Sequence, residues 1–254
     1  MASSVELPPA QLHYFACRSR GEPIRLLCAL IGRDFEEWSV PEVQHNGRRQ
    51  LPPPPGDPAP RYLSGEAGKL NNLAAFPLGT CPAWVERIGD EEVVINQSMA
   101  ILRHLARGAS LLGTKPAEQA FVDVWLDQCE DVRTAYSKVI YGLDGPPFSE
   151  TLGNDDALVA AKFAAHTPSV EAAFQPFEKR LAESSLLAGE AITVADIALF
   201  DIFDMHLRVW AGALTEAAFP FLHAHRARVS AQPGVAAYLA SGKRWSIING
   251  NNLG

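Results

Sequence analysis

The pattern of apolar residues changes near residue 110, and this change limits the possible folds more than any other feature. From about residue 11 to 106, short strand-like and helix-like pieces alternate; from about 116 the pattern is helical almost to the end. A chain of 254 residues is long enough for two domains, each with its own core. We therefore expect an α/β domain over residues 1–107, a linker over 108–117 and an all-helical domain over 118–254.

The first part has a strand–helix–strand opening and a strand–strand–helix end. Leu12–Phe15 predicts a short strand, and RGEPIRLLCALIG predicts a helix whose apolar face includes Cys28, which we expect to be buried. FEEWSV, PAWVERI and EEVVIN predict three more strands, the last two joined by a turn at Gly89–Asp90. A helix beginning near Ser98 completes this unit.

Residues 41–72 have no regular period, and QLPPPPGDPAPRY fits neither helix nor strand. We interpret about 48–68 as an exposed, partly polyproline surface insertion. A ligand for a proline-binding module is the alternative.

Long amphipathic helices are predicted for the second part. AEQAFVDVWLDQCEDVRTAYSKVIYGL repeats apolar residues at steps of three and four, and another helical stretch covers roughly 155–183. In ITVADIALFDIFDMHL, Thr193 and Asp196 resemble a capping box before a helix that is apolar on most sides. This helix is expected to form the buried centre of the second domain.

Charge and hydropathy exclude several classes of partner. The chain has 22 Lys and Arg against 29 Asp and Glu, a net charge of −7, which argues against nucleic acids and anionic membranes. No apolar stretch approaches the length of a membrane span, and residues 1–13 lack the features of a signal peptide. We expect a soluble protein that is not exported.

The cysteines and the paired histidines do not form a metal-site pattern. The cysteines form no C-x-x-C pair, so disulfides and zinc are not expected, and a reducing, cytoplasmic location fits. His223 and His225 alternate, but residues two apart on a helix point in different directions, so we expect them to face solvent.

The segment EEVVINQSMAILRHL passes from strand to helix with no acidic residue at the junction. A carboxylate commonly complements a helix N-terminus, and its absence at Gln97 and Ser98 leaves room for an external anion. The alternative is that Ser98 simply caps the helix.

Several segments together give a family resemblance. YFACRSRGEPIRLL, QSMAILRHLAR, EDVRTAYSKVIY, ITVADIALFD and INGN occur in the order found in soluble glutathione transferases, and the chain is most similar to the pi class, with mu and sigma as near relatives. The resemblance implies a thioredoxin-like β-α-β-β-β-α domain that binds glutathione and an all-α domain that carries the electrophile site.

The implied activity is conjugation of the glutathione thiolate to small hydrophobic electrophiles, a detoxification reaction of a cytoplasmic homodimer. Glutathione is the co-substrate, with no permanently bound cofactor and no metal. Tyr14 stands at the position of the catalytic tyrosine, whose neutral phenol donates to the thiolate, and Arg20 matches the active-site arginine. The alternatives are thiol–disulfide exchange by Cys17 and a non-catalytic binder of glutathione or apolar ligands.

The resemblance also implies two sets of site residues. Pro82 is expected in the cis form, so that the backbone of Cys81 pairs with the cysteinyl part of glutathione. Asp131 is expected to reach across a two-fold interface to the γ-glutamyl amine. The glutathione-binding set is Tyr14, Arg20, His45, Lys69, Cys81, Pro82, Gln97, Ser98 and Asp131. The electrophile-binding set is Phe15, Cys17, Ser137, Tyr141, Asn249 and Gly250.

Overall fold

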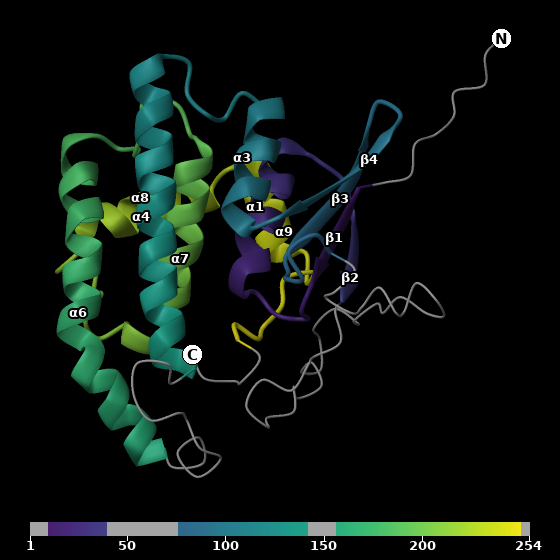
Figure 1. Ribbon diagram of the computed structural model, residues 1–254. Coiled ribbons are helices and arrows are strands. Elements are labelled where there is room, and N and C mark those ends of the chain that lie inside the picture. The colour runs from purple at the N-terminus through teal and green to yellow at the C-terminus, as the bar shows by residue number, and fades with distance from the viewer. Residues whose placement is uncertain (1–9, 40–75, 142–155, 250–254) are drawn as a thin grey trace.

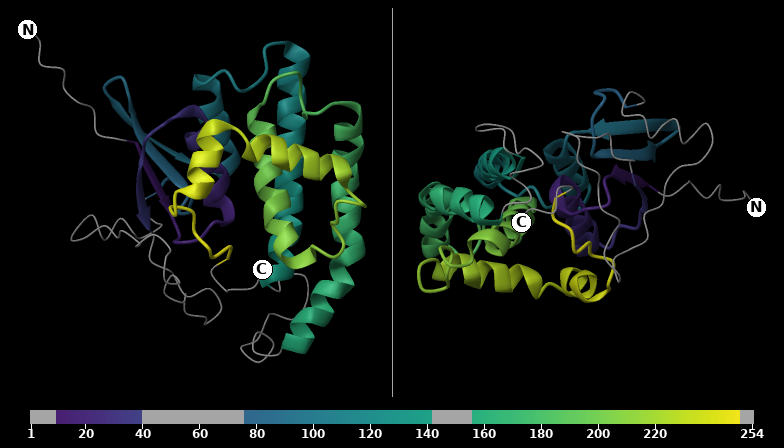
Figure 2. Two further views of the ribbon diagram at one scale, coloured as in Figure 1. Left: turned by 180° about the vertical axis from the view of Figure 1, so that it is seen from behind. Right: turned by 90° about the horizontal axis from the view of Figure 1, so that it is seen from below.

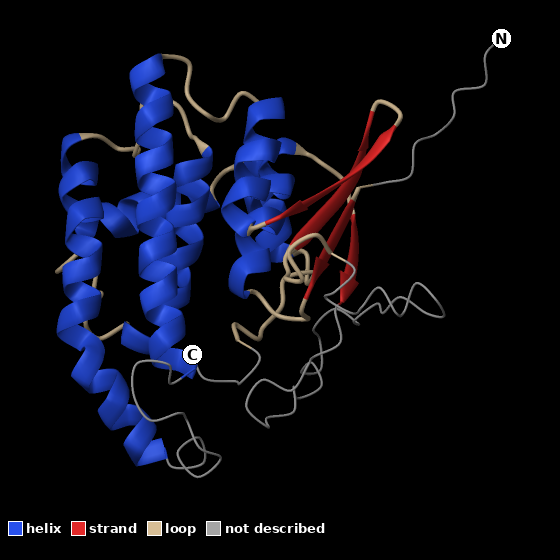
Figure 3. Cartoon of the chain, in the orientation of Figure 1, coloured by secondary structure: helices blue, strands red, loops and turns tan. Residues whose placement is uncertain are grey.

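A small mixed sheet and a group of long helices lie side by side, with two helices between them (Figures 1 and 3). The computed structural model describes residues 10–39, 76–141 and 156–249. The proline-rich stretch and three of the predicted site residues, His45, Lys69 and Gly250, lie outside these ranges.

The sheet follows the predicted strand–helix–strand and strand–strand–helix plan. Its strands lie in the order β2-β1-β3-β4, with β1 and β2 parallel and the other two pairs antiparallel. This is the thioredoxin-like arrangement expected for the first domain. The elements are β1 Gln11–Tyr14, α1 Glu22–Ile31, β2 Glu36–Ser39, β3 Ala83–Ile88, β4 Glu91–Asn96 and α3 Ser98–Gly108.

Helices α1 and α3 lie between the sheet and the helical domain (Figure 1). Pro23 stands in the first turn of α1, where its missing N–H costs nothing, and Gly32 ends the helix in the left-handed conformation at φ 65°. Cys28 is buried on the inner face of α1, as predicted.

Five helices make up the second domain in the described part of the chain: α4 Pro116–Tyr141, α6 Asp156–Glu183, α7 Val194–Trp210, α8 Pro220–Ser230 and α9 Pro233–Ala240. The predicted capping box is present at the start of α7, between Thr193 and Asp196. Helix α9 packs against α1 so closely that a Cβ on Gly234 would lie 2.0 Å from the carbonyl oxygen of Ala29. Only glycine permits this approach.

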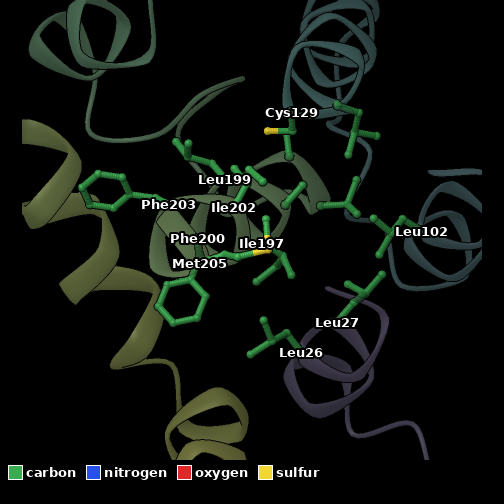
Figure 4. Packing of buried hydrophobic residues seen from close by; sticks show 14 of the residues in the cluster. Leu26, Leu27, Leu102, Cys129, Ile197, Leu199, Phe200, Ile202, Phe203 and Met205 are labelled. Atoms are coloured by element: carbon green, nitrogen blue, oxygen red, sulfur yellow. The ribbon is translucent and has the colours of Figure 1, made fainter. Parts of the chain in front are cut away.

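The apolar core centres on α7 and continues into both domains. Ile197, Phe200 and Met205 of α7 lie close to Leu27 of α1 and Cys129 of α4 (Figure 4). All five side chains are at most 3% exposed. The prediction that this helix is the buried centre is confirmed, and α7 packs against both α4 and α1.

The prediction that two histidines face solvent is wrong. His225 is only 2% exposed, with Nε2 3.0 Å from Oδ1 of Asp196, and half-buried His223 contacts the carbonyl oxygen of Leu214 at 2.8 Å. Helix α8 packs against both α6 and α7, so more than one of its faces is covered. Within the described ranges, no cluster of three or more His, Cys, Asp or Glu side chains could hold a metal ion.

Candidate functional site

Tyr14 ends β1 with its side chain 4% exposed, and its hydroxyl oxygen accepts a hydrogen bond from the backbone N–H of Arg20 at 3.0 Å. Burial raises the pKa of this phenol, and the nearby thiols of Cys17 and Cys81 raise it further, whereas the Ser19 side chain opposes the shift. The phenol therefore stays protonated at neutral pH. With the Arg20 N–H on its oxygen, the phenol can donate its own proton to an anion.

A tight loop brings Arg20 to the phenol through a short 3₁₀ helix over Ser19–Gly21. A Cβ on Gly21 would lie 2.5 Å from Cδ1 of Tyr14, so glycine is required where the loop closes on the ring. The guanidinium of Arg20 forms an ion pair with Glu130 of α4. The loop is thus tied to the helical domain as well as to the sheet.

A second basic side chain of α4 supports this loop. Arg133 of α4 is 1% exposed, donates to the backbone carbonyl of Ser19 at 3.2 Å and forms a buried ion pair with Asp201 of α7. Its positive charge is close enough to the Tyr14 phenol for the two groups to interact electrostatically. Both Glu130 and Arg133 were missed by the sequence interpretation, although they flank the predicted Asp131 in EDVR.

The start of β3 lies beside the phenol. The Cys81–Pro82 peptide bond is cis, as expected. The half-buried Cys81 thiol is close enough to Tyr14 to influence its pKa, and burial raises the pKa of Cys81 itself to about 12. Cys81 is therefore a thiol rather than a thiolate at neutral pH, and its backbone is the part suited to bind a ligand.

The N-terminus of α3 adjoins this segment. Ala83 pairs with Asn96, and the Asn96 side chain donates to the carbonyl of Thr80 at 2.6 Å, so the next residues, Gln97 and Ser98, lie beside the cis bond. The N-cap residue is Gln97, at φ 73°, and it makes no side-chain capping bond. Buried Ser98 is the first helical residue and not the cap, and the first turn has no acid. Ser98 is therefore not the N-cap, and the external anion at this helix start stays a prediction.

The remaining candidates lie either near the Tyr14 phenol and the end of α4 or on the outer surface of α4. Phe15 contacts the Tyr14 ring at a centroid distance of 5.4 Å, and Tyr141, the last residue of α4, interacts electrostatically with the phenol. Half-buried Ser137 lies one turn before Tyr141. Buried Asn249 donates through Nδ2 to the hydroxyl of Tyr136 at 2.8 Å and reaches α4. Exposed Asp131, by contrast, lies on the outer surface of α4.

The structure therefore brings five predicted residues together around the phenol of Tyr14: Phe15, Cys17, Arg20, Cys81 and Tyr141. Cys17 is 2% exposed. A thiol buried in this way is poorly placed to attack a disulfide in solution.

Comparison with known proteins agrees with this arrangement. Residues 145–233 match the family model described as "Glutathione S-transferase, C-terminal domain". Over 251 residues the chain is 30% identical to glutathione S-transferase P of Pongo abelii, covering 96% of this chain and 99% of that protein. It is 30% identical to glutathione S-transferase P 1 of Xenopus laevis, covering 94% and 95%.

Solved structures show the same fold. The pi-class glutathione S-transferase of Onchocerca volvulus superimposes with a TM-score of 0.69 at 24% identity, covering 96% of this chain and 99% of that one. A glutathione S-transferase from Caenorhabditis elegans gives a TM-score of 0.65 at 27% identity, covering 92% and 98%.

Proposed function

This chain belongs to the glutathione S-transferase family, and we propose that it uses Tyr14 to ionise glutathione and transfers the thiolate to small hydrophobic electrophiles. It is an enzyme with glutathione as co-substrate. The observation that carries the proposal is the buried, protonated phenol with a backbone N–H on its oxygen. We propose that residues 1–107 bind glutathione, that 108–117 form a linker and that 118–254 supply the electrophile site.

Ionisation of the thiol is the chemical problem that this site solves. A free thiol has a pKa of about 8.5, and lowering it by about two units requires about 3 kcal/mol of preferential stabilisation of the thiolate. A hydrogen bond from Tyr14 to a charged sulfur supplies about 1.5–3 kcal/mol. Arg20 and Arg133 also place positive charge near the site, partly balanced by their ion pairs with Glu130 and Asp201. The thiol proton passes to solvent, and the sulfur then forms a bond to the electrophilic carbon. In a substitution the displaced electron pair departs with the leaving group, and in an addition it moves onto an electron-withdrawing group of the electrophile.

Binding of the tripeptide uses backbone groups in this proposal. The γ-glutamyl carboxylate accepts from the hydroxyl of Ser98 and the N–H groups that begin α3, with Gln97 beside it. The cysteinyl part pairs with the backbone of Cys81, next to the cis bond of Pro82. His45 and Lys69 stay predictions for the glycine carboxylate.

The electrophile is proposed to lie between the loop after β1 and the end of α4. Phe15 and Tyr141 supply aromatic surface, whereas Cys17 and Ser137 make the lining more polar, and Asn249 is assigned to the same site through its bond to Tyr136 of α4. The hydroxyl of Tyr141 can donate to negative charge that develops on the electrophile. Gly250 stays a prediction for the same site.

We also propose a homodimer built on the outer face of α4. Phe121 and Val124 are 52% and 56% exposed, and their spacing of three places them on one helix face. Asp131, seven residues after Val124, continues this face. A second copy that covers the apolar part would bring Asp131 towards the partner's γ-glutamyl group, as the family resemblance implies.

We propose a cytoplasmic location and a role in detoxification, as the family resemblance implies. Among the described residues, no helix is both long and apolar enough to pass through a membrane, and no disulfide joins the cysteines. Free cysteines fit a reducing compartment, and the net charge of −7 argues against nucleic-acid and anionic-membrane partners.

The decisive experiment combines turnover and capture. The purified protein is assayed for conjugation of glutathione to a chlorinated nitrobenzene and for retention on immobilised glutathione, alongside the Tyr14→Phe and Cys17→Ser variants. We expect turnover and retention, with activity lost in Tyr14→Phe and kept in Cys17→Ser. Retention without turnover would indicate a non-catalytic binder, and loss only in Cys17→Ser would indicate thiol–disulfide chemistry.

A further inference from the structure

We propose that Arg244, in the segment that follows α9, is a positioning residue for conjugation, because it holds residues 243–249 against the loop that carries Arg20. This inference rests on the proposed function and adds a residue that the family resemblance did not suggest. Figure 2 shows the yellow C-terminal segment leaving the helical domain and returning to the purple N-terminal part.

The segment uses its backbone to hold the loop. The backbone N–H of Arg18 donates to the carbonyl of Ile247 at 2.9 Å, and the N–H of Ser19 donates to that of Ile248 at 3.0 Å. The Arg18 side chain also donates to the carbonyl of Trp245. Residues remote in sequence are thus joined by backbone hydrogen bonds directly before Arg20.

The loop needs this support because its backbone is unusual. Ser19 has a φ of 31°, a positive value that a residue with a side chain rarely adopts without outside restraint. The next backbone N–H, that of Arg20, is the one that donates to Tyr14 at 3.0 Å. A change in the backbone at Ser19 therefore reorients the donor on the catalytic phenol.

Arg244 anchors the segment at two points. Its Nε lies 2.6 Å from Oε1 of Glu22, the first residue of α1, and its Nη2 lies 2.8 Å from Oδ2 of Asp204 in α7. The Arg244 side chain is only 15% exposed, and both carboxylates are buried. Because Glu22 directly follows Gly21, the first anchor lies at the end of the same loop. The planar guanidinium suits a bridge between two carboxylates, which an ammonium group cannot reproduce.

Each carboxylate has other partners that remain if Arg244 is replaced. Glu22 also contacts Arg25 at 3.4 Å and accepts from the hydroxyl of Tyr238 at 3.1 Å. Asp204 also contacts Arg226 of α8 at 2.5 Å and Arg18 at 3.7 Å. Neither carboxylate is then left without a cation, so a neutral residue at 244 is expected to allow folding.

Arg226 provides a matched control. It forms two hydrogen bonds to Oδ1 of Asp204, at 3.0 and 2.5 Å, but belongs to α8 rather than to the segment or the loop. Arg226→Gln therefore removes one positive charge from the same carboxylate without releasing the segment. A general loss of charge or stability would affect both variants alike, whereas positioning concerns Arg244 alone.

The test compares the wild-type protein with Arg244→Gln, Arg244→Lys and Arg226→Gln. Initial rates with glutathione and a chlorinated nitrobenzene are measured over pH, and the ionisation of bound glutathione is followed by thiolate absorbance without the electrophile. In Arg244→Gln we expect kcat at neutral pH to fall about threefold, with the thiol pKa about one unit higher and KM for glutathione within about twofold. Arg226→Gln is expected to match the wild type. Arg244→Lys should change in the same direction as Arg244→Gln but by less.

Other results would overturn the inference. Wild-type pH profiles in Arg244→Gln, an equal change in Arg226→Gln, or an effect confined to KM would each do so. If Arg244→Gln fails to fold, a wild-type profile in Arg244→Lys would have the same meaning. A wild-type protein without any turnover would instead overturn the proposed function, and this inference with it.

Discussion

Replacement of Tyr14 by Phe is the sharpest test of the proposed chemistry, because it removes one oxygen and keeps the ring. Tyr14 is 4% exposed, and its ring centroid lies 5.4 Å from that of Phe15. Phenylalanine keeps the ring, so these apolar contacts survive. The substitution removes the acceptor for the Arg20 N–H at 3.0 Å, the hydrogen bond to the Ser19 side chain and the proposed donor to sulfur.

The expected size of the effect follows from these losses. The loss of a hydrogen bond to a charged group costs about 1.5–3 kcal/mol, which corresponds to a rise of about one to two units in the pKa of bound glutathione. If the wild-type enzyme lowers the thiol pKa by about two units, to about 6.5, the thiolate fraction at neutral pH, and with it kcat/KM, should fall about threefold to twenty-five-fold. The unpaired Arg20 N–H should lower the free energy of unfolding by only about 1 kcal/mol, because this residue is partly exposed.

The assay measures kcat/KM for conjugation against pH, together with thiolate absorbance of the binary complex. The Tyr14→Phe profile should shift to higher pH and approach the wild-type maximum once solvent ionises the thiol. An unshifted profile, or a loss that is equal at every pH, would refute the claim that this phenol acts by stabilising the thiolate.

Three further predictions concern packing and pH. In Gly21→Ala, the new Cβ would lie 2.5 Å from the Tyr14 ring, so kcat should fall about tenfold; unchanged steady-state rates would show that the loop can yield. Asp196→Ala removes a fully buried acceptor that contacts His225 and caps α7, and should cost about 3–5 kcal/mol in urea unfolding; a cost below about 1 kcal/mol would contradict this. Burial lowers the pKa of His206 from 6.5 to about 3, so the native side chain stays neutral while the unfolded chain takes up a proton below pH 6.5. Stability should therefore decline as pH falls from 6.5 towards 3, and His206→Leu should reduce that slope by about 1.4 kcal/mol per pH unit; equal slopes would refute this.

Much of the local structure was predictable because it depends on nearest neighbours in the chain. The proline and glycine that bound α1 and the capping box of Thr193 and Asp196 are local patterns. The order of these segments also identified the family and placed Tyr14 and Arg20 in one site. The local pattern at Gln97 and Ser98 left two interpretations open, and the structure removes one of them, because Ser98 is not the cap.

Partners remote in sequence were not predictable in the same way. Arg20 and Glu130 are 110 positions apart, and Arg244 and Glu22 are 222 positions apart. A charged side chain at a helix surface has the same local pattern whether it faces water or a carboxylate from another element. His225 was misplaced for this reason.

The sequence by itself determined which segments form strands and helices, which faces are apolar and which family the chain resembles. The tertiary structure alone decided which charges meet, since packing the C-terminal segment on α1 and α7 brings Arg244 to Glu22 and Asp204. The physical reason is range: periodicity and capping act over a few residues, whereas ion pairs depend on the packing of the whole chain.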